Sequence, residues 1–369
     1  MTGHRQPRSN SPDCYIGIDL GTSGVRAIAI DPSREVVAEA IVPIAPPLRA
    51  RAGLSEQSPQ LWWEAVTGVL SSLAMRLPDH RIRALAVDGT SSTLLLSEPD
   101  GTPLTPGLMY DDTRSRDSLN LLAAVAPPAS PVHSAASSLA KLLHLSRDIG
   151  AQEFLVLHQA DWILGRLSGH YGISDENNCL KLGYDPIARN WPEWMDSLPI
   201  PPACLPQVHP PGRIIGRLAD ETARLTRLPN CCRLVTGTTD SNAATLATGV
   251  SLVGEAVTSL GSTLVLKILS DRPVMAPEFG VYSHRLGDQW LVSGASNSGG
   301  AVCAHYFTQQ QIRELTRRLE PDKPTGLDYY PLSQAGERFP VNDPDYPPRL
   351  SPRTPSDIEF FQGILEGIA

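Results

Sequence analysis

The chain has 369 residues, of which 41% are hydrophobic and 19% charged, a balance that is ordinary for a globular protein with room for two domains. Its formal net charge of −8 and the lack of a basic stripe exclude a nucleic-acid surface, and no run approaches the roughly 18 apolar residues of a membrane span. The six cysteines form no C-x-x-C pair, which excludes a zinc ribbon and indicates reduced thiols in a cytoplasmic protein.

The first 13 residues are polar and are expected to form a disordered head. A hairpin pattern follows over residues 15–31, with Asp19 near the end of its first apolar run and glycines that give the bend its backbone freedom. The tip consists of Gly21, Thr22, Ser23 and Gly24. Bare N–H groups and hydroxyls suit phosphate oxygens, and a carboxylate suits a metal ion, although any hairpin tip needs small polar residues.

Three elements are predicted next, namely a strand over residues 36–44, a helix over 60–76 and a strand over 81–87. The last strand ends in Asp88-Gly89-Thr90-Ser91-Ser92-Thr93, and small polar groups at strand ends face ligands in α/β folds. A strand over 94–97 follows. The stretch 110–114 then offers Asp112 and Arg114, which either orient a ligand or pair with each other.

Residues 115–170 are predicted to be mostly helical, with amphipathic spacing over 138–145 and 155–167. His144 and His158 are interpreted as satisfied surface or core histidines, because neither has a nucleophile beside it in the sequence. The proline-rich stretch 199–213 is expected to connect without regular structure. A strand over 214–218 and a helix near 220–227 lead to a strand that runs into Asp240, which is either a helix N-cap or a general base.

A second hairpin pattern covers residues 257–269 and turns at Gly261, Ser262 and Thr263. Two such hairpins far apart suggest an internal duplication, in which each of two similar domains offers a hydroxyl-bearing turn to a common cleft. A hairpin over 281–293 leads to Gly299 and Gly300 before a helix, where a nucleotide would lie on helix N–H groups. Residues 321–355 are proline-rich, and a last helix is predicted over 358–368.

Three of these stretches together resemble the FGGY family of carbohydrate kinases, in the actin/hexokinase/Hsp70 superfamily. The turn 21–24 resembles the family's first phosphate motif, the turn 261–263 its second, and the segment around Asp240 its catalytic aspartate. The loop 88–93 and the segment 180–184 are closest to the D-ribulose kinase or xylulose kinase-like branch of cyanobacteria and plants. The resemblance implies an α/β fold of two ribonuclease H-like domains around a cleft, over residues 14–247 and 248–369.

The resemblance also implies a role for each candidate residue. Asp240 would be the catalytic base, and Asp19 would hold Mg²⁺. ATP would be bound by Asp19, Gly21, Thr22, Ser23, Gly261, Ser262, Thr263, Gly299 and Gly300, and the sugar by Asp19, Thr90, Ser91, Asp112 and Asp240. The family's sugar loop usually carries Gln where this chain has Ser and Thr. The expectation of D-ribulose as substrate therefore comes only from the resemblance to that branch.

The implied activity is phosphorylation of a terminal sugar hydroxyl by ATP, in a monomer or homodimer that binds neither nucleic acid nor membrane. The family continues for about 50 to 130 residues after the final helix, so we expect the second domain to be truncated. Two alternatives stay open: a non-catalytic sugar-binding or regulatory relic, and an actin- or Hsp70-like ATPase that moves partners.

Overall fold

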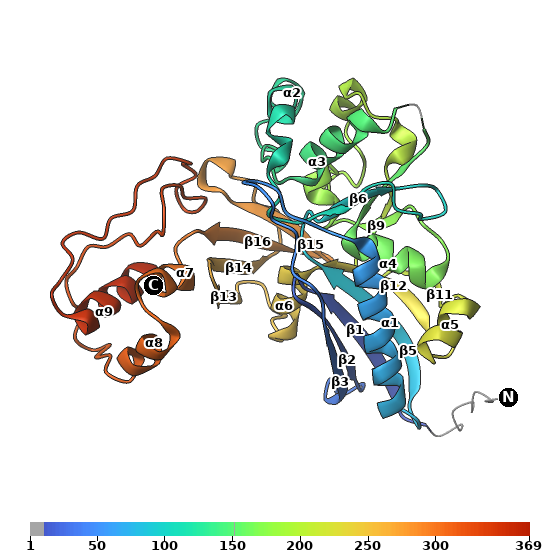
Figure 1. Ribbon diagram of the computed structural model, residues 1–369, viewed down its shortest axis with the longest axis horizontal. Helices are drawn as coiled ribbons and strands as arrows, with labels where there is room; N and C mark the ends of the chain where they lie inside the picture. The colour runs from blue at the N-terminus through green and yellow to red at the C-terminus, as the bar shows by residue number, and fades with distance from the viewer. Residues whose placement is uncertain (1–10, 151) are drawn as a thin grey trace. The chain divides into compact units, whose positions relative to one another are not determined.

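The computed structural model describes residues 11–150 and 152–369. It divides into two compact units, of which the first ends at Ala247 and the second begins at Thr248. Both units combine strands and helices, so the α/β class is confirmed (Figure 1). Residues 1–10 of the expected head lie outside the described residues, and Asp13, its last residue, is the first residue of a strand. Within the described ranges, no helix is long and apolar enough to cross a membrane.

Unit 1 is built on a six-stranded sheet with the order β11-β12-β5-β1-β2-β3. Its strands are β1 (Asp13–Leu20), β2 (Gly24–Ile30), β3 (Val36–Pro43), β5 (Arg81–Gly89), β11 (Ile214–Arg217) and β12 (Arg233–Thr239). The central strands β1, β5 and β12 run parallel, and the other three pair antiparallel. The carboxyl ends of three neighbouring strands therefore share one edge of the sheet.

One face of this sheet is covered by helices (Figure 1). The helices are α1 (Pro59–Arg76), α4 (Gln159–Ser168) and α5 (Asp220–Thr226). Trp62 of α1 and Trp162 of α4 meet edge to face with ring centroids 6.3 Å apart, and both are buried in the same core. In β1 the alternate residues Ile16, Ile18 and Leu20 are buried in this core, so Asp19 points to the opposite face of the sheet.

A second core in unit 1 surrounds a four-stranded sheet with the order β4-β7-β6-β8. The strands are β4 (Glu56–Gln57), β6 (Leu94–Ser97), β7 (Gly107–Leu108) and β8 (Leu155–His158), and the helices are α2 (Leu119–Val125) and α3 (Ser138–Leu145). Short 3₁₀ helices of unit 1 cover Arg114–Ser118, Ser146–Asp148, Cys179–Leu182, Glu193–Ser197 and Pro202–Cys204.

Two predictions for this region are wrong in part. Residues 155–158 belong to strand β8 rather than to a helix, because they pair with β6, and α4 begins only at Gln159 behind a capping box made by His158 and Asp161. The connector 199–213 contains strand β10 (Gln207–His209), which pairs with β9 (Ile173–Asp175). In both places a partner distant in sequence supplies the hydrogen bonds that local composition does not reveal.

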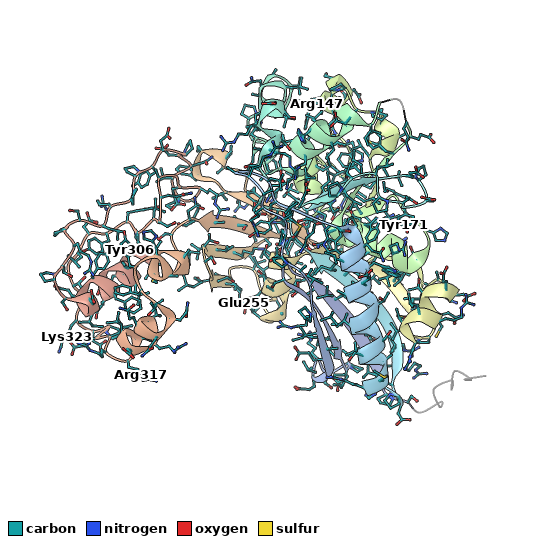
Figure 2. All side chains as sticks on the ribbon, in the orientation of Figure 1. Arg147, Tyr171, Glu255, Tyr306, Arg317 and Lys323 are labelled. Atoms are coloured by element: carbon teal, nitrogen blue, oxygen red, sulfur yellow. The ribbon has the colours of Figure 1, made fainter. Side chains whose placement is uncertain are left out.

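Unit 2 contains a four-stranded antiparallel sheet with the order β13-β14-β16-β15. Its elements are β13 (Ala256–Leu260), β14 (Leu264–Ser270), β15 (Tyr282–Leu286), β16 (Gln289–Ser296), a 3₁₀ helix at Pro277–Phe279, and helices α7 (Gly300–Tyr306), α8 (Gln309–Thr316) and α9 (Asp357–Ile368). Both predicted hairpins of this unit are confirmed. The helices enclose their own small core, which includes Phe360. The exposed Tyr306, labelled in Figure 2, meets Phe360 edge to face at 5.2 Å.

Candidate functional site

Three carboxylates gather where the central parallel strands of unit 1 end. Asp19 of β1 lies opposite Asp88 of β5 in the parallel register, and Asp88 lies opposite Thr238 of β12. Asp240 follows β12 directly and is the first residue of helix α6 (Asp240–Ala247). Strand ends of this kind are where open α/β sheets bind their ligands.

Asp88 has a strongly raised pKa at this edge of the sheet. Burial, the nearby carboxylates of Asp19 and Asp240, and a hydrogen bond with Asp19 raise the pKa of Asp88 to about 8. Three like charges this close are not all retained without a compensating cation, so the Asp88 carboxyl holds its proton near neutral pH. A strongly perturbed pKa among converging acids is typical of a functional site.

Some of the buried polar atoms without a hydrogen-bond partner lie at the same edge. They include Asp88 Oδ1, Thr239 Oγ1 and, on the adjoining start of α4, Gln159 Nε2. Native proteins pair most of their buried polar groups, so a group of unpaired ones at the ends of adjacent strands indicates atoms that a polar ligand or water would satisfy.

Asp240 begins helix α6, and its role as a general base stays a prediction. Its Oδ1 accepts a hydrogen bond from Ser241 N at 2.7 Å, which is a local helix-start contact. Its neighbour Thr238 is held by Asn177, whose Nδ2 donates to Thr238 Oγ1 at 3.0 Å. The junction that carries Asp240 is thus fixed by the segment after β9.

The loop after β5 presents its hydroxyls unequally. Thr90 is only 6% exposed, and its N–H and hydroxyl both donate to Gln159 Oε1 at 3.2 Å. Ser91 is more exposed, whereas Ser92 is 2% exposed and has a left-handed φ of 64°. Of the two predicted sugar contacts in this loop, Ser91 is therefore the one with the more accessible side chain.

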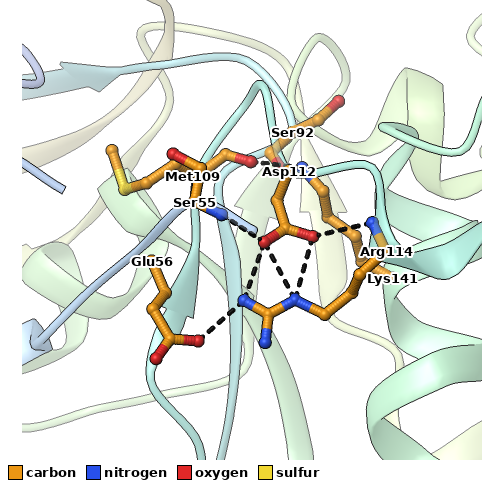
Figure 3. A network of polar contacts seen from close by, with 7 residues as sticks. All are labelled: Ser55, Glu56, Ser92, Met109, Asp112, Arg114 and Lys141. Atoms are coloured by element: carbon orange, nitrogen blue, oxygen red, sulfur yellow. Dashed lines mark hydrogen bonds and ion pairs between the residues drawn. The ribbon is translucent and has the colours of Figure 1, made fainter. Parts of the chain in front are cut away.

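Asp112 and Arg114 pair with each other, which was one of the two interpretations (Figure 3). Asp112 is fully buried, and its Oδ2 accepts from Ser55 N at 2.8 Å and from Arg114 Nη2 at 2.7 Å. Arg114 Nη2 also donates to Glu56 Oε2 at 2.7 Å. This network ties segment 109–114 to strand β4.

The first turn, residues 21–24, is supported from behind through its main chain. Gln57 Nε2 donates to Thr22 O at 3.0 Å, and Ile44 N donates to Ser23 O at 3.0 Å. The glycines act differently from the expectation of backbone freedom, because neither has a positive φ. Instead they allow close approach: a Cβ on Gly24 would lie 3.2 Å from Val42 O.

The second turn, residues 261–263, is braced by the segment that carries Gly299 and Gly300. Gly300 N donates to Gly261 O at 2.8 Å, and Ala301 N donates to Ser262 O at 3.1 Å. A Cβ on either Gly299 or Gly300 would lie 2.7 Å from the main chain of the turn, so packing alone requires glycine at both positions. These two amides of the predicted nucleotide segment already donate within unit 2.

Sequence reasoning missed several residues of these sites. Asp88 was named only as the start of the loop 88–93 and given no role, although like Asp19 it ends an apolar run of strand type. Lys141, Gln159 and Glu337 gave no such signal, since each acts on a main-chain segment far away in sequence. Glu337, for example, accepts from Ser296 Oγ and Asn297 N at 2.7 Å each.

The acidic edge suits a magnesium ion that brings most of its own ligands. Across residues 11–150 and 152–369, no group of three or more Asp, Glu, His or Cys side chains is arranged to hold a metal by itself. Mg²⁺ in phosphoryl-transfer sites is typically bound through one or two carboxylates, with phosphates and waters completing its shell. The Asp19 carboxylate fits that requirement, with the unpaired Asp88 Oδ1 at the same strand edge.

Comparison with known proteins shows where this architecture recurs. The N-terminal domain profile of the FGGY family of carbohydrate kinases matches residues 14–247. The chain is 27% identical to xylulose kinase of Escherichia coli K12 over 286 residues, which cover 75% of this chain and 59% of that protein. It is 25% identical to xylulose kinase of Klebsiella pneumoniae over 371 residues, covering 96% of this chain and 76% of that protein.

A solved structure gives the same fold. Ligand-bound xylulose kinase from Lactobacillus acidophilus superposes with a TM-score of 0.85 at 19% identity, over 96% of this chain and 76% of that one. The family profile covers more than half of the residues, including all three acids of the strand edge. The chain belongs to the FGGY family of carbohydrate kinases.

Proposed function

We propose that the chain transfers the γ-phosphoryl group of ATP to a terminal hydroxyl of a small sugar. The observation that carries the proposal is the convergence of Asp19, Asp88 and Asp240 at the carboxyl ends of three adjacent strands. Phosphoryl transfer needs positioned charges and a proton acceptor more than covalent groups, and the acids of this edge would supply both. Sugar kinases among the relatives support the reaction class.

Asp240 is the proposed base. It would accept the proton of the attacking hydroxyl, which strengthens the nucleophile as the bond to phosphorus forms. Asp19 would hold the Mg²⁺ that accompanies ATP, and that ion supplies charge neutralisation on the phosphate oxygens when bound. Asp88, neutral near pH 7, would donate its proton in a hydrogen bond to Asp19 and so limit the negative charge beside the phosphates.

Thr22, Ser23 and the main chain around Gly21 are the proposed phosphate contacts of unit 1. Their turn has its carbonyls bound from behind by Gln57 and Ile44, which keeps the hydroxyl side of the turn available. In unit 2 the proposed contacts are Gly261, Ser262 and Thr263, with Gly299 and Gly300 packed directly against them.

The proposed sugar contacts are Asp19, Asp240, Thr90 and Ser91, with Asp112 acting through its pair with Arg114. We propose a pentulose as the substrate class and D-ribulose as the member to test first, because the loop 90–93 offers short hydroxyls. Relatives of the chain include a xylulose kinase, a gluconokinase and an apulose kinase, so xylulose, gluconate and apulose belong in the same panel.

All six cysteines are unpaired, which supports a reducing, cytoplasmic setting.

A coupled assay of ADP release across pentuloses, polyols and gluconate tests the proposal. We expect sugar-dependent turnover with Mg²⁺ and a loss of 10²- to 10⁴-fold in kcat for Asp240→Ala, as for removal of a general base. Calorimetry should still detect sugar binding by this variant. Wild-type turnover by Asp240→Ala would refute the assignment of the base, and a wild-type chain that binds sugars without turnover would favour a sugar-binding relic.

A further inference from the structure

Lys141 is a buried cation that none of the proposed chemistry uses. It lies on helix α3, is fully buried, and is one of the largest completely enclosed side chains of the described chain. Its Nζ donates to Ser92 O at 2.8 Å and to Met109 O at 2.6 Å (Figure 3). Both acceptors are main-chain carbonyls, so the contacts fix backbone rather than side chains.

The two carbonyls belong to the two loops that carry the proposed sugar contacts. Ser92 follows Thr90 and Ser91 in the loop after β5, and Met109 precedes the segment that contains Asp112. The second loop is also held from its other side, because Asp112 accepts from Ser55 N at 2.8 Å. Lys141 is thus the link between a loop at the acidic edge and a segment already anchored to β4.

The energetics of this link argue against a purely stabilising role. Burying an ammonium group is expensive, and the two hydrogen bonds of Lys141 go to neutral carbonyls rather than to a carboxylate. The loop it holds is itself strained, since Ser92 has a φ of 64° that costs a non-glycine residue free energy. Strained backbone persists where the surroundings over-determine it, and it clusters at ligand-binding sites.

The two hydrogen bonds of Lys141 do not require the lysine to be charged. Burial lowers the pKa of Lys141 to about 7, while the carboxylates of Asp112 and Asp111 act in the opposite direction, and Lys181 and Arg114 add to the lowering. A neutral amine still has two N–H donors, which is the number that the two carbonyls require. The geometry of the loops therefore does not depend on the charge of this group.

We infer that Lys141 is a positioning residue for sugar recognition: by binding Ser92 O and Met109 O it sets the distance between the loop 90–93 and the segment 109–114. This inference rests on the proposed function. It assigns to Lys141 the selection among sugars rather than the binding of nucleotide. Replacement by Met keeps an unbranched apolar side chain, one atom shorter than that of Lys, and removes both hydrogen bonds.

Steady-state kinetics with the best sugar substrate test the inference. For Lys141→Met we expect the sugar KM to rise about tenfold, with a KM for ATP within twofold of wild type and a reduced preference between the best and second-best sugars. Lys141→Arg keeps donors for both carbonyls and should recover part of the lost affinity. The control is Lys323→Met, an exposed lysine of unit 2 labelled in Figure 2, which should match wild type.

Equal sugar KM values in wild type and Lys141→Met would overturn the inference, as would equal increases of the KM for sugar and for ATP. If Lys141→Met does not fold, amide hydrogen exchange is measured on Lys141→Arg instead. Relative to wild type, exchange over residues 90–93 must then increase together with the sugar KM. Unchanged exchange with a raised KM would also overturn it. Absence of sugar-dependent turnover in wild type would instead reject the proposed function.

Discussion

The protonated state of Asp88 can be tested by its effect on stability. The carboxyl has a pKa of about 8 in the folded chain, whereas an unfolded aspartate titrates near its ordinary value of 3.8. Folding therefore takes up a proton between these two pH values. Because the folded state binds more protons, the free energy of unfolding falls as pH rises, and this contribution is fully present only below pH 4.

The size of the effect follows from linkage. One proton taken up on folding changes the free energy of unfolding by about 1.4 kcal/mol per pH unit, so wild type should lose about 3 kcal/mol from this group between pH 5 and pH 7. Asp88→Asn, which mimics the neutral acid, lacks that dependence. Burial and the nearby Asp161 raise the pKa of Asp175 to about 7. Its titration affects the stability of both proteins equally, so it cancels when the two are compared.

Urea unfolding at pH 5, 6 and 7 with EDTA and without nucleotide measures the difference. Tryptophan fluorescence reports mainly on unit 1, which contains five of the six tryptophans. Between pH 5 and pH 7, the free energy of unfolding of Asp88→Asn should rise by about 3 kcal/mol relative to that of wild type. The exposed Asp79→Asn serves as the control, and curves of wild type and Asp88→Asn that stay parallel with pH would refute a neutral Asp88.

Three further outcomes are expected. Gly237→Ala should cost more than about 3 kcal/mol in chemical denaturation, because its Cβ would lie 1.7 Å from Val87 O, while Gly216→Ala, with open space around its Cβ, should be nearly neutral. Glu337→Ala should raise the KM for ATP about tenfold and leave the sugar KM unchanged, because it frees Ser296 and Asn297 behind the second turn. Sugar-dependent ADP release should stop in EDTA and return with Mg²⁺, and turnover that is insensitive to EDTA would contradict the proposed metal.

Local patterns of the sequence predict much of the fold. The hairpins at residues 21–24 and 261–263, helix α1 and strand β12 were visible because their apolar periodicity and turn residues lie within short windows. Strand β8 was mistaken for the start of a helix because its partner, β6, lies some 60 residues earlier in the chain and local spacing cannot reveal it.

The site was predictable where a strand ends in an acid. Asp19 and Asp240 were predicted in this way, and the structure places both near Asp88, which follows the same rule. The supporting residues were hidden because their role depends on tertiary contacts: Gln159 and Lys141 each hydrogen-bond the 90–93 loop from helices that the sequence presents as ordinary amphipathic segments.

Phosphorus NMR of the chain with Mg²⁺, ATP and D-ribulose tests the central claim most directly, with xylulose and gluconate in parallel samples. The proposed chemistry predicts a new phosphomonoester resonance, coupled to the two protons of a terminal carbon, that grows in step with ADP and is absent with Asp240→Asn. Inorganic phosphate as the sole product with every sugar, or an ester that forms equally fast with Asp240→Asn, would contradict the claim that this acidic edge directs phosphate to a sugar hydroxyl.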